Sequence, residues 1–207
     1  MKRPGKIVCV GRNYLEHAAE LGNVVPQEPL LFLKPPSAVI ASGEEIVLPD
    51  ASSRVEHEGE IGVVVGAELR RVGEEEAIRG ILGITCVNDI TARDLQKTDG
   101  QWTRAKGFDT FCPVGPSIVP LDQLPPLDAL EVFCRVNGVE RQHGQAARMA
   151  FSIPMLLSYI SHIMTLEPGD VVSTGTPSGV GPLVPGDLVE VEIPKVGVLV
   201  NPVIARV

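Results

Sequence analysis

The stretch Arg54-Val-Glu-His-Glu-Gly-Glu-Ile-Gly-Val-Val-Val65 does most to decide the fold of this chain. It ends in an apolar, β-branched run, which predicts a β-strand with acidic residues at its start. Successive side chains on a strand point to opposite faces, so Glu58 and Glu60 share one face. A second apolar run, Ile84-Thr-Cys-Val-Asn-Asp-Ile90, predicts another strand, with Asp89 near its end.

Glu58, Glu60 and Asp89 together predict a metal site. Three carboxylates that converge beside a core repel one another unless a cation lies between them. Oxygen ligands in this number suit Mg²⁺, Mn²⁺ or Ca²⁺ better than zinc. The alternative is that Glu56, Glu58 and Glu60 only form the solvated face of an antiparallel sheet. His57 lies between the two ligand positions, so the strand period predicts that it packs on the opposite face.

Size and charge limit the classes of protein to which the chain can belong. Its 207 residues suit one sizeable core, and 44% hydrophobic with 21% charged residues is typical of a globular protein. The net charge of −8 argues against a nucleic-acid partner. No apolar run approaches the roughly 18 residues of a membrane span, and Ile7–Val10 is too short for a signal-peptide core.

The cysteines are expected to be small buried side chains without disulfide partners. They form no Cys-x-x-Cys pair, and each lies in or beside an apolar segment: Cys9, Cys86, Cys112 and Cys134. This pattern indicates a reducing compartment, so we expect a cytoplasmic protein.

The fold is expected to be mainly β. The 21 glycines and 18 prolines, with few long helical patterns, predict many short strands joined by tight turns. The clearest hairpin joins Leu130–Arg135 to Val139–Gln142, because Asn137-Gly138 supplies a turn that matches strand twist. Helices are predicted over Arg12–Gly22, with Asn13 as its cap, over Glu74–Arg79 and over Ser152–Met164. No shift in composition marks a boundary, so residues 1–207 are expected to form a single domain.

The first predicted helix carries a candidate pair for activating water. His17 and Glu20 stand three positions apart, so they share one face of the helix. A carboxylate beside an imidazole raises its basicity and fixes its tautomer, which is how a general base for water is assembled. The alternative is an exposed pair without a role.

The stretch after the second strand is rich in polar residues that suit a site. It contains Asp89, Arg93, Gln96, Trp102 and Lys106 in close succession. A lysine near an oxyanion adds positive charge where negative charge develops. Arg93 and Asp94 are equally explained as an ordinary surface pair, which contributes little to stability.

A glycine-rich loop, Thr174-Gly-Thr-Pro-Ser-Gly-Val-Gly-Pro182, follows a predicted strand near the carboxyl-terminal end. It lacks the Gly-Lys-Ser/Thr ending of a nucleotide-binding P-loop, so it does not indicate ATP binding. Its small residues let backbone N–H groups and the Thr176 hydroxyl approach a carboxylate closely.

Together, these stretches resemble the fumarylacetoacetate hydrolase family, and especially its compact single-domain branch of acylpyruvate hydrolases and oxaloacetate decarboxylases. The matching motifs span nearly the whole chain in the family's order, and they specify the family more closely than the reaction. They are Val10-Gly-Arg-Asn-Tyr14, His17-x-x-Glu20, Leu31-Phe-Leu-Lys-Pro35, His57-Glu-Gly-Glu60, Asn88-Asp-Ile-Thr-Ala-Arg-Asp-Leu-Gln96, Trp102-Thr-x-Ala-Lys-Gly-Phe108, Phe151-Ser-Ile-Pro154 and Thr174-Gly-Thr-Pro177.

The resemblance implies a mixed, mainly β (α+β) fold. In the family, this is a rolled, sandwich-like sheet assembly with a few short helices, usually as a homodimer. The resemblance also implies that Mg²⁺ or Mn²⁺ is held by Glu58, Glu60 and Asp89.

The same resemblance implies roles for residues around that ion. His17 and Glu20 would activate water, on a helix that acts as a lid. Lys106 would be catalytic and lie against the oxygens of the substrate. The implied substrate-binding positions are Arg12, Gln96 and Thr176.

The implied reaction is hydrolysis of a C–C bond in an acylpyruvate or a related 2,4-dioxo acid. The metal and Lys106 would stabilise the enolate that forms when the C3–C4 bond breaks, while activated water attacks C4. Two alternatives share this enolate: decarboxylation of oxaloacetate, and isomerisation or decarboxylation of 2-hydroxyhepta-2,4-diene-1,7-dioate in aromatic catabolism. An alternative of another class is a non-catalytic module that binds a metal or a carboxylate.

Overall fold

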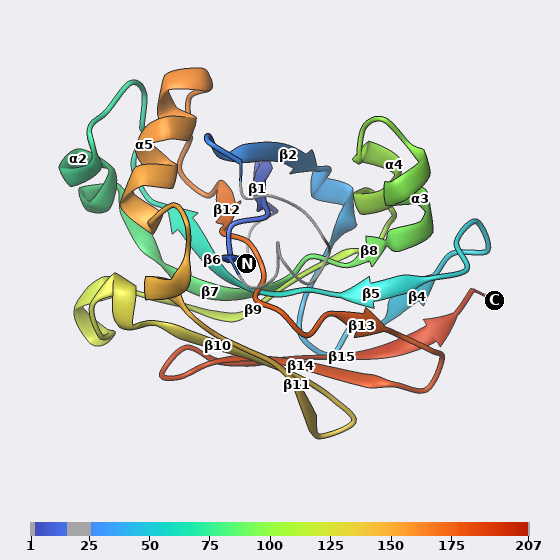
Figure 1. Cartoon of the computed structure of the whole chain (residues 1–207). Helices are drawn as coiled ribbons and strands as arrows, with labels where there is room; N and C mark the ends of the chain where they lie inside the picture. The colour runs from blue at the N-terminus through green and yellow to red at the C-terminus, as the bar shows by residue number, and fades with distance from the viewer. Residues whose placement is uncertain (1–2, 16–25, 207) are drawn as a thin grey trace.

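Three β-sheets form the framework of the described structure (Figure 1). It is a computed structural model that describes residues 3–15 and 26–206. In spatial order, the largest sheet contains β2 (Leu30–Lys34), β1 (Ile7–Gly11), β12 (Val171–Ser173), β6 (Gly59–Val65), β7 (Ile81–Asn88), β9 (Cys112–Val119) and β3 (Val39–Ile40). The second contains β11 (Val139–Gln145), β10 (Glu131–Val136), β14 (Leu188–Ile193), β15 (Gly197–Ala205) and β4 (Ile46–Leu48). The third contains β13 (Gly181–Pro182), β5 (Val55–His57) and β8 (Thr91–Ala92).

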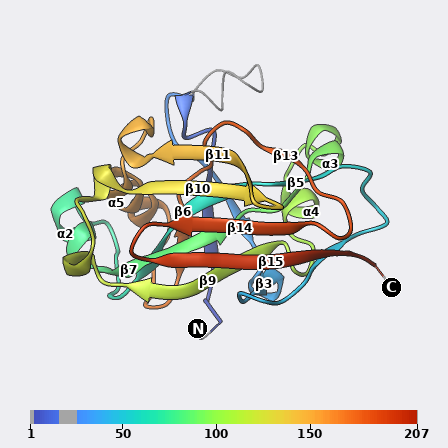
Figure 2. The ribbon, with the colours of Figure 1, turned by 90° about the horizontal axis from the view of Figure 1, so that it is seen from below.

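Four short α-helices lie at two ends of these sheets in the described part of the chain (Figures 1 and 2). At one end are α2 (Glu74–Arg79) and α5 (Ile153–Ile163), and at the other are α3 (Arg93–Thr98) and α4 (Thr103–Lys106). Short 3₁₀ segments cover Pro36–Ala38, Leu121–Gln123, Leu127–Ala129 and Ala146–Arg148. The predicted fold, a mainly β assembly of rolled sheets with a few short helices, is confirmed.

The main hydrophobic core lies between the seven-stranded and five-stranded sheets, which pack as two layers (Figure 1). Ile61, Val63 and Val65 of β6 belong to this core, together with Val132 of β10 and Val191 of β14. Because these residues alternate along their strands, one face of each strand is buried between the layers. Burial of this apolar surface is the main contribution that holds the two sheets together.

A second, smaller cluster lies on the opposite face of the seven-stranded sheet. It contains Cys9, Val64, Val87 and Cys112. Glu60 and Val64 are an even number of positions apart on β6, so both point to this second face. Glu60 is only 2% exposed there, and Glu56 and Glu58 are also buried. The interpretation of these glutamates as a solvated face is therefore wrong.

The predicted single strand through Val55–Val65 is interrupted at Glu58 in the structure. The part before the interruption pairs in the three-stranded sheet, and the part after it pairs in the seven-stranded sheet. At the junction, the Glu58 N–H donates to Asn88 Oδ1 at 3.0 Å, and the Asp89 N–H donates to the Glu58 carbonyl at 2.9 Å. These bonds come from a distant part of the chain, so a local pattern of apolar residues does not reveal the break.

Several predicted elements are confirmed. The hairpin turns at Asn137 and Gly138, whose φ angles of 54° and 74° are the positive values that such a turn requires. The helix α5 begins after Ser152, whose hydroxyl accepts from the Met155 N–H at 3.4 Å.

Most of the predicted helix Arg12–Gly22 falls in residues 16–25, outside the described residues. Its expected cap, Asn13, is buried and has other partners. The Asn13 amide donates to the carbonyls of Thr174 (2.8 Å) and Phe151 (3.1 Å), and its oxygen accepts from the Phe151 N–H (2.9 Å). This side chain therefore ties the end of β1 to two segments that lie far away in the sequence.

The four cysteines are buried and unpaired, as expected. Burial raises the pKa of the Cys112 and Cys134 thiols to about 12. Within the described ranges, none of the helices combines the length and the apolar content that crossing a membrane requires.

Candidate active site and metal centre

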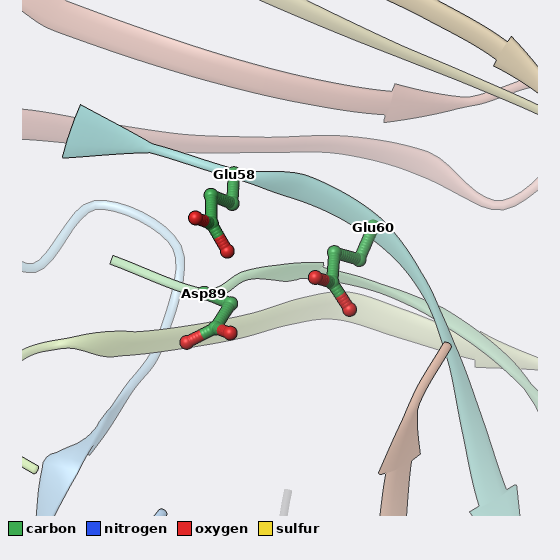
Figure 3. Close-up of side chains that lie close together, drawn as sticks. All are labelled: Glu58, Glu60 and Asp89. Atoms are coloured by element: carbon green, nitrogen blue, oxygen red, sulfur yellow. The ribbon is translucent and has the colours of Figure 1, made fainter. Parts of the chain in front are cut away.

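The three predicted ligands meet at one end of the seven-stranded sheet (Figure 3). Glu58 lies at the break before β6, Glu60 lies on β6, and Asp89 follows β7. Gly59 pairs with Asn88 in the antiparallel ladder, so the residues that flank this pair come close together. One carboxylate oxygen from each residue lies within 4.8 Å of the others, and all three side chains are buried.

Two buried lysines contact this acidic cluster. The Lys106 ammonium donates to Glu58 Oε2 at 2.7 Å and to Asp89 Oδ2 at 2.6 Å. The Lys34 ammonium donates to Asp89 Oδ1 at 2.5 Å and to the Ile90 carbonyl at 3.0 Å. Burial alone would lower the pKa of Lys106, but the charges of Asp89 and Glu58 outweigh it and raise the pKa. Lys106 is therefore held in its charged form.

Arg93 connects the metal-ligand candidates to a predicted substrate residue. Its guanidinium donates to Glu56 Oε2 (2.6 Å), to Glu58 Oε1 (2.5 Å) and to Gln96 Oε1 (2.6 Å). Burial opposes the ionisation of Glu56, but the Arg93 charge and hydrogen bonds from Arg54 and Arg93 lower its pKa. Glu56 is thus paired with arginines and is not one of the three carboxylates that converge.

The interpretation of Arg93 and Asp94 as a surface pair is wrong. Arg93 is buried in the acidic cluster. Asp94 instead accepts from the hydroxyls of Ser52 at 2.6 Å and Ser53 at 2.9 Å, so it fastens α3 to the loop before β5.

Glu60 is in a different environment from the other two carboxylates. Its Oε2 accepts from the Ser173 hydroxyl at 2.6 Å and from the Gly175 N–H at 2.7 Å. Among the described residues, it has no lysine or arginine within ion-pair distance. Burial, with the charges of Asp89 and Glu58, raises the pKa of Glu60 to about 8. Without a metal, this carboxyl therefore holds a proton at neutral pH.

The charge balance of the cluster fits a divalent cation. Among the described residues, four buried carboxylates (Glu56, Glu58, Glu60 and Asp89) face three buried cations (Lys34, Arg93 and Lys106). One negative charge is left over among these buried groups when all of them are ionised; the largely exposed Arg54, which also pairs with Glu56, is not counted. A divalent ion would reverse this excess to one positive charge, which suits an anionic substrate. Because the donors are all oxygen atoms, a hard ion such as Mg²⁺ or Mn²⁺ fits best.

A cavity of about 50 Å³ opens onto this cluster. It is small, so it holds only an ion and a few water-sized groups. Phe32 and Trp102 form an apolar wall, with their rings edge to face and 5.3 Å between centroids. The cavity brings together seven of the predicted site residues: Arg12, Glu58, Glu60, Asp89, Gln96, Lys106 and Thr176. His17 and Glu20 lie outside the described residues, so their predicted role in activating water stays a prediction.

Three polar or charged residues of this site received no role from sequence reasoning. Lys34 and Arg93 bind the acidic cluster, and Asn88 fixes the strand break at Glu58. The sequence signal for Lys34 was weak: it follows the apolar run Leu30–Leu33, but a lysine at a strand end is usually exposed.

His57 lies on the side away from the metal-ligand candidates, as the strand period predicts. It is 1% exposed, and its Nδ1 is 3.0 Å from Gln142 Oε1 and 3.4 Å from Cys134 Sγ. Burial lowers the pKa of His57. The residue therefore packs as a neutral side chain against the five-stranded sheet, with one hydrogen bond that the sequence did not predict.

Comparison with known proteins places the chain in a family. The family description "Fumarylacetoacetate (FAA) hydrolase C-terminal" matches residues 6–204, so the chain belongs to the fumarylacetoacetate hydrolase family. This is a family of enzymes whose members generally bind a divalent metal ion. The resemblance found in the sequence motifs, including the compact single-domain branch, is confirmed.

Its relatives carry out different reactions, according to their names. The mitochondrial oxaloacetate decarboxylase of Dictyostelium discoideum is 45% identical over 190 residues, which cover 89% of this chain and 87% of that protein. A mitochondrial oxaloacetate tautomerase of Homo sapiens is 40% identical over 211 residues, which cover 98% and 67%. The crystal structure of 2-hydroxyhepta-2,4-diene-1,7-dioate isomerase from Mycobacterium marinum superposes with a TM-score of 0.90 at 45% identity, over 99% of this chain and 76% of that one.

The raised pKa of Glu60 predicts how stability depends on pH when no metal is bound. The folded protein keeps this proton up to about pH 8, whereas the unfolded chain loses it near the ordinary value of 4.5. Between these values the folded state binds more protons, so the free energy of unfolding falls as pH rises, by at most about 1.4 kcal/mol per pH unit. Urea unfolding in chelator at several pH values between these limits measures the slope.

Glu60→Gln should remove this slope, because the amide cannot ionise and its oxygen still accepts both hydrogen bonds. Glu75→Gln, at an exposed position on α2, serves as the control and should leave the slope unchanged. A slope that persists in Glu60→Gln would assign the titration to another group.

Removing the charge of Lys34 should destabilise the protein strongly. Lys34→Met leaves the buried Asp89 carboxylate with one cationic partner fewer, and losing one member of a buried ion pair costs about 3–5 kcal/mol. Urea unfolding in chelator measures the change. Lys97→Met, an exposed lysine on α3, should change the free energy of unfolding by less than about 0.5 kcal/mol. Equal stability of the two variants would contradict the assigned pairing.

Proposed function

We propose that this protein is a divalent-metal-dependent hydrolase that cleaves a C–C bond of acylpyruvates or related 2,4-dioxo acids. The observation that carries this proposal is the single small cavity that three carboxylates and Lys106 share. We further propose that residues 1–207 act as one catalytic domain, in a cytoplasmic homodimer with a small oxo acid as substrate. Neither a nucleic acid nor a membrane is part of this proposal.

In this proposal, Mg²⁺ or Mn²⁺ binds to Glu58, Glu60 and Asp89. The ion would supply a Lewis acid for the oxygens of the oxo acid. Its binding is supported by the negative charge that is left over among the buried groups once Glu60 is ionised, and by the close approach of three ligand oxygens.

The chain's own residues would bind and orient the substrate. Arg12 and Gln96 line the cavity and suit the carboxylate of the oxo acid. Arg93 donates to the amide oxygen of Gln96 and so fixes its orientation. The NH₂ group of Gln96 is then left to donate to the substrate. Phe32 and Trp102 limit the access of water to the reacting carbons.

Lys106 is proposed to stabilise the charge that develops during bond cleavage. When water attacks C4, the electron pair of the C3–C4 bond moves to the pyruvate fragment and forms an enolate. The Lys106 ammonium is buried and charged, so it would lower the free energy of this anion. Protonation at C3 then gives pyruvate, and the acyl part leaves as a carboxylic acid.

A larger groove beside the cavity suits the acyl part of the substrate. It has a volume of about 770 Å³ and shares Arg12, Phe32 and Trp102 with the cavity. Its lining includes Leu30–Leu33. We therefore place the reacting end of the oxo acid in the cavity and its apolar tail in this groove.

Decarboxylation of oxaloacetate is the second candidate reaction. It is supported by the relatives that are named oxaloacetate decarboxylase and oxaloacetate tautomerase. The isomerase from Mycobacterium marinum supports a third reaction through a related enolate. The same buried lysine and carboxylates would stabilise the enolate in all three reactions. Only measurements of turnover therefore distinguish one reaction from another.

Removing a ligand should abolish metal binding and turnover together. Glu58→Gln and Asp89→Asn each replace one anionic ligand by an amide, which binds a divalent ion more weakly. Titration with Mn²⁺ and the cleavage of acetylpyruvate measure the two effects. Glu75→Gln is the matched control on the surface. Full activity of either ligand variant in chelated buffer would rule out the proposal.

Turnover of a panel of oxo acids also tests the non-catalytic alternative. Mg²⁺ and oxalate, which resembles the pyruvate enolate, should together raise the melting temperature more than either does alone. Joint binding without turnover of any oxo acid in the panel would instead support a metal- or carboxylate-binding module.

The role of water separates hydrolysis from decarboxylation. Hydrolysis needs a base for the attacking water, whereas decarboxylation needs no such base. His17→Ala should therefore lower kcat/KM for acetylpyruvate by about 10²- to 10⁴-fold and leave oxaloacetate decarboxylation much less affected. Steady-state kinetics on both substrates measure the difference. Equal losses on both substrates would remove the support for hydrolysis over decarboxylation.

A further inference from the structure

The Gln142 side chain connects the five-stranded sheet to two walls of the candidate site. It lies on β11 and is 1% exposed. Its Oε1 accepts from the Gly59 N–H and lies against His57 Nδ1, both at 3.0 Å. Its Nε2 donates to Thr176 Oγ1 and to the Pro177 carbonyl, both at 2.7 Å. Every donor and acceptor position of the amide is therefore in use.

The orientation of this amide is fixed by its two backbone partners. The Gly59 N–H can only donate, so it requires the amide oxygen, and the Pro177 carbonyl can only accept, so it requires the NH₂ group. Rotation of the amide by 180° would break both bonds. The Gln142 oxygen at His57 Nδ1 can only accept, whereas Cys134 Sγ, 3.4 Å from the same nitrogen, can donate or accept. Because the amide oxygen is the closer and stronger partner, a neutral His57 carries its proton on Nδ1.

The same network determines what Thr176 can do. Its hydroxyl proton is donated to the Gly59 carbonyl at 2.9 Å, and its oxygen accepts from Gln142. A hydroxyl has one proton, so none is left to donate to a substrate. The Thr176 hydroxyl is therefore satisfied within the protein, and its expected approach to a substrate carboxylate stays a prediction. The Thr176 N–H, however, has no acceptor within the described residues, and Thr176 lines the cavity.

The loop around Thr176 packs closely on β11 beyond Gln142. A Cβ atom on Gly144 would lie 2.6 Å from Pro177 Cβ, which is too close. A Cβ atom on Gly179 would lie 1.9 Å from the Arg141 carbonyl oxygen, and Gly179 has a φ of +99°, which favours glycine. The loop therefore packs closely on β11 at two points, Arg141 and Gly144. The Gln142 amide holds the loop between these two points.

We propose that Gln142 is a positioning residue that sets the Thr176 loop and the start of β6 in the arrangement that binds an oxo acid. It acts on the Gly59 link between Glu58 and Glu60 and on the loop that presents the Thr176 N–H. The Gly175 N–H of this loop also donates to Glu60, so the two walls are coupled. The proposal rests on the proposed function, because its ligand is an oxo acid. The tautomer of His57, however, is measured without any ligand.

The first test is the protonation of His57 in the wild-type protein. ¹⁵N NMR above the ordinary range of histidine titration should show the Nδ1–H tautomer. The Nε2–H tautomer would mean that Gln142 does not hold the assigned orientation, and it would overturn the proposal. This measurement needs no substrate, no metal and no variant.

The second test uses two variants that remove different parts of the network. Gln142→Met removes all four interactions, whereas Gln142→Glu keeps the acceptor for Gly59 and His57 and loses the donor for the loop. Both should lower the affinity for oxalate, measured by calorimetry at saturating Mn²⁺, by about 10–100-fold. Only Gln142→Met should lose the Nδ1–H tautomer of His57. A merely structural role would not separate the two variants in this way.

Gln145→Met is the matched control, because Gln145 lies on the same strand and is exposed. It should keep the oxalate affinity and the His57 tautomer of the wild type. With acetylpyruvate as substrate, the Gln142 variants should raise KM more than they lower kcat. Unchanged oxalate affinity in Gln142→Met or Gln142→Glu would overturn the proposal.

The outcomes remain separate from those for the proposed function. If Gln142→Met does not fold, the wild-type tautomer and the Gln142→Glu affinity decide the question. If the wild type binds neither Mn²⁺ nor oxalate, the proposed function fails, and the Thr176 amide resonance then decides the positioning role. A large shift of that resonance in Gln142→Glu supports the role, and an unchanged resonance overturns it.

Discussion

The structure depends on the compensation of charge inside one end of a β-sheet. Transferring a carboxylate or an ammonium group out of water costs several kcal/mol, and this cost is offset only where opposite charges and hydrogen bonds meet with good geometry. Asp89 satisfies this condition through two lysines, and Glu58 through Lys106 and Arg93. Glu60 does not, since only neutral donors reach its side chain among the described residues. A buried carboxylate without a cationic partner in the described part of the chain is what distinguishes this candidate cation site from an ordinary buried network of ion pairs.

The sheet topology explains why these charges come together. An unbroken strand would have kept Glu58 in the regular ladder, but the chain leaves one sheet and enters another at this residue. The Asn88 side chain takes the place of a ladder partner for the Glu58 N–H, and the carbonyl of Glu58 receives the Asp89 N–H. The rigid two-layer core on one side of the sheet thereby holds a polar cluster on the other side.

The sequence predicts the ligand positions because the relevant information is local. The spacing of Glu58 and Glu60 determines their common direction, and the motif around Asp89 ends a strand that pairs beside them. The partners of these residues could not be predicted in the same way. Lys34, Arg93 and Gln142 reach the site from three different elements, and only the folded chain shows which carboxylate or amide each one contacts. The hydrogen bonds of the Thr176 hydroxyl could not be predicted for a similar reason, because the direction of a hydroxyl proton depends on neighbours that are distant in the sequence.

The burial of the four thiols has a consequence for how the protein meets oxidants. Only a thiolate reacts quickly with peroxide or with a disulfide, and these side chains are both covered and strongly disfavoured in that ionised form. Their modification therefore requires a transient opening of the sheets. The rate at which a thiol reagent labels the protein therefore reports how often such openings occur. Oxidation of these thiols would be confined to molecules that have already opened.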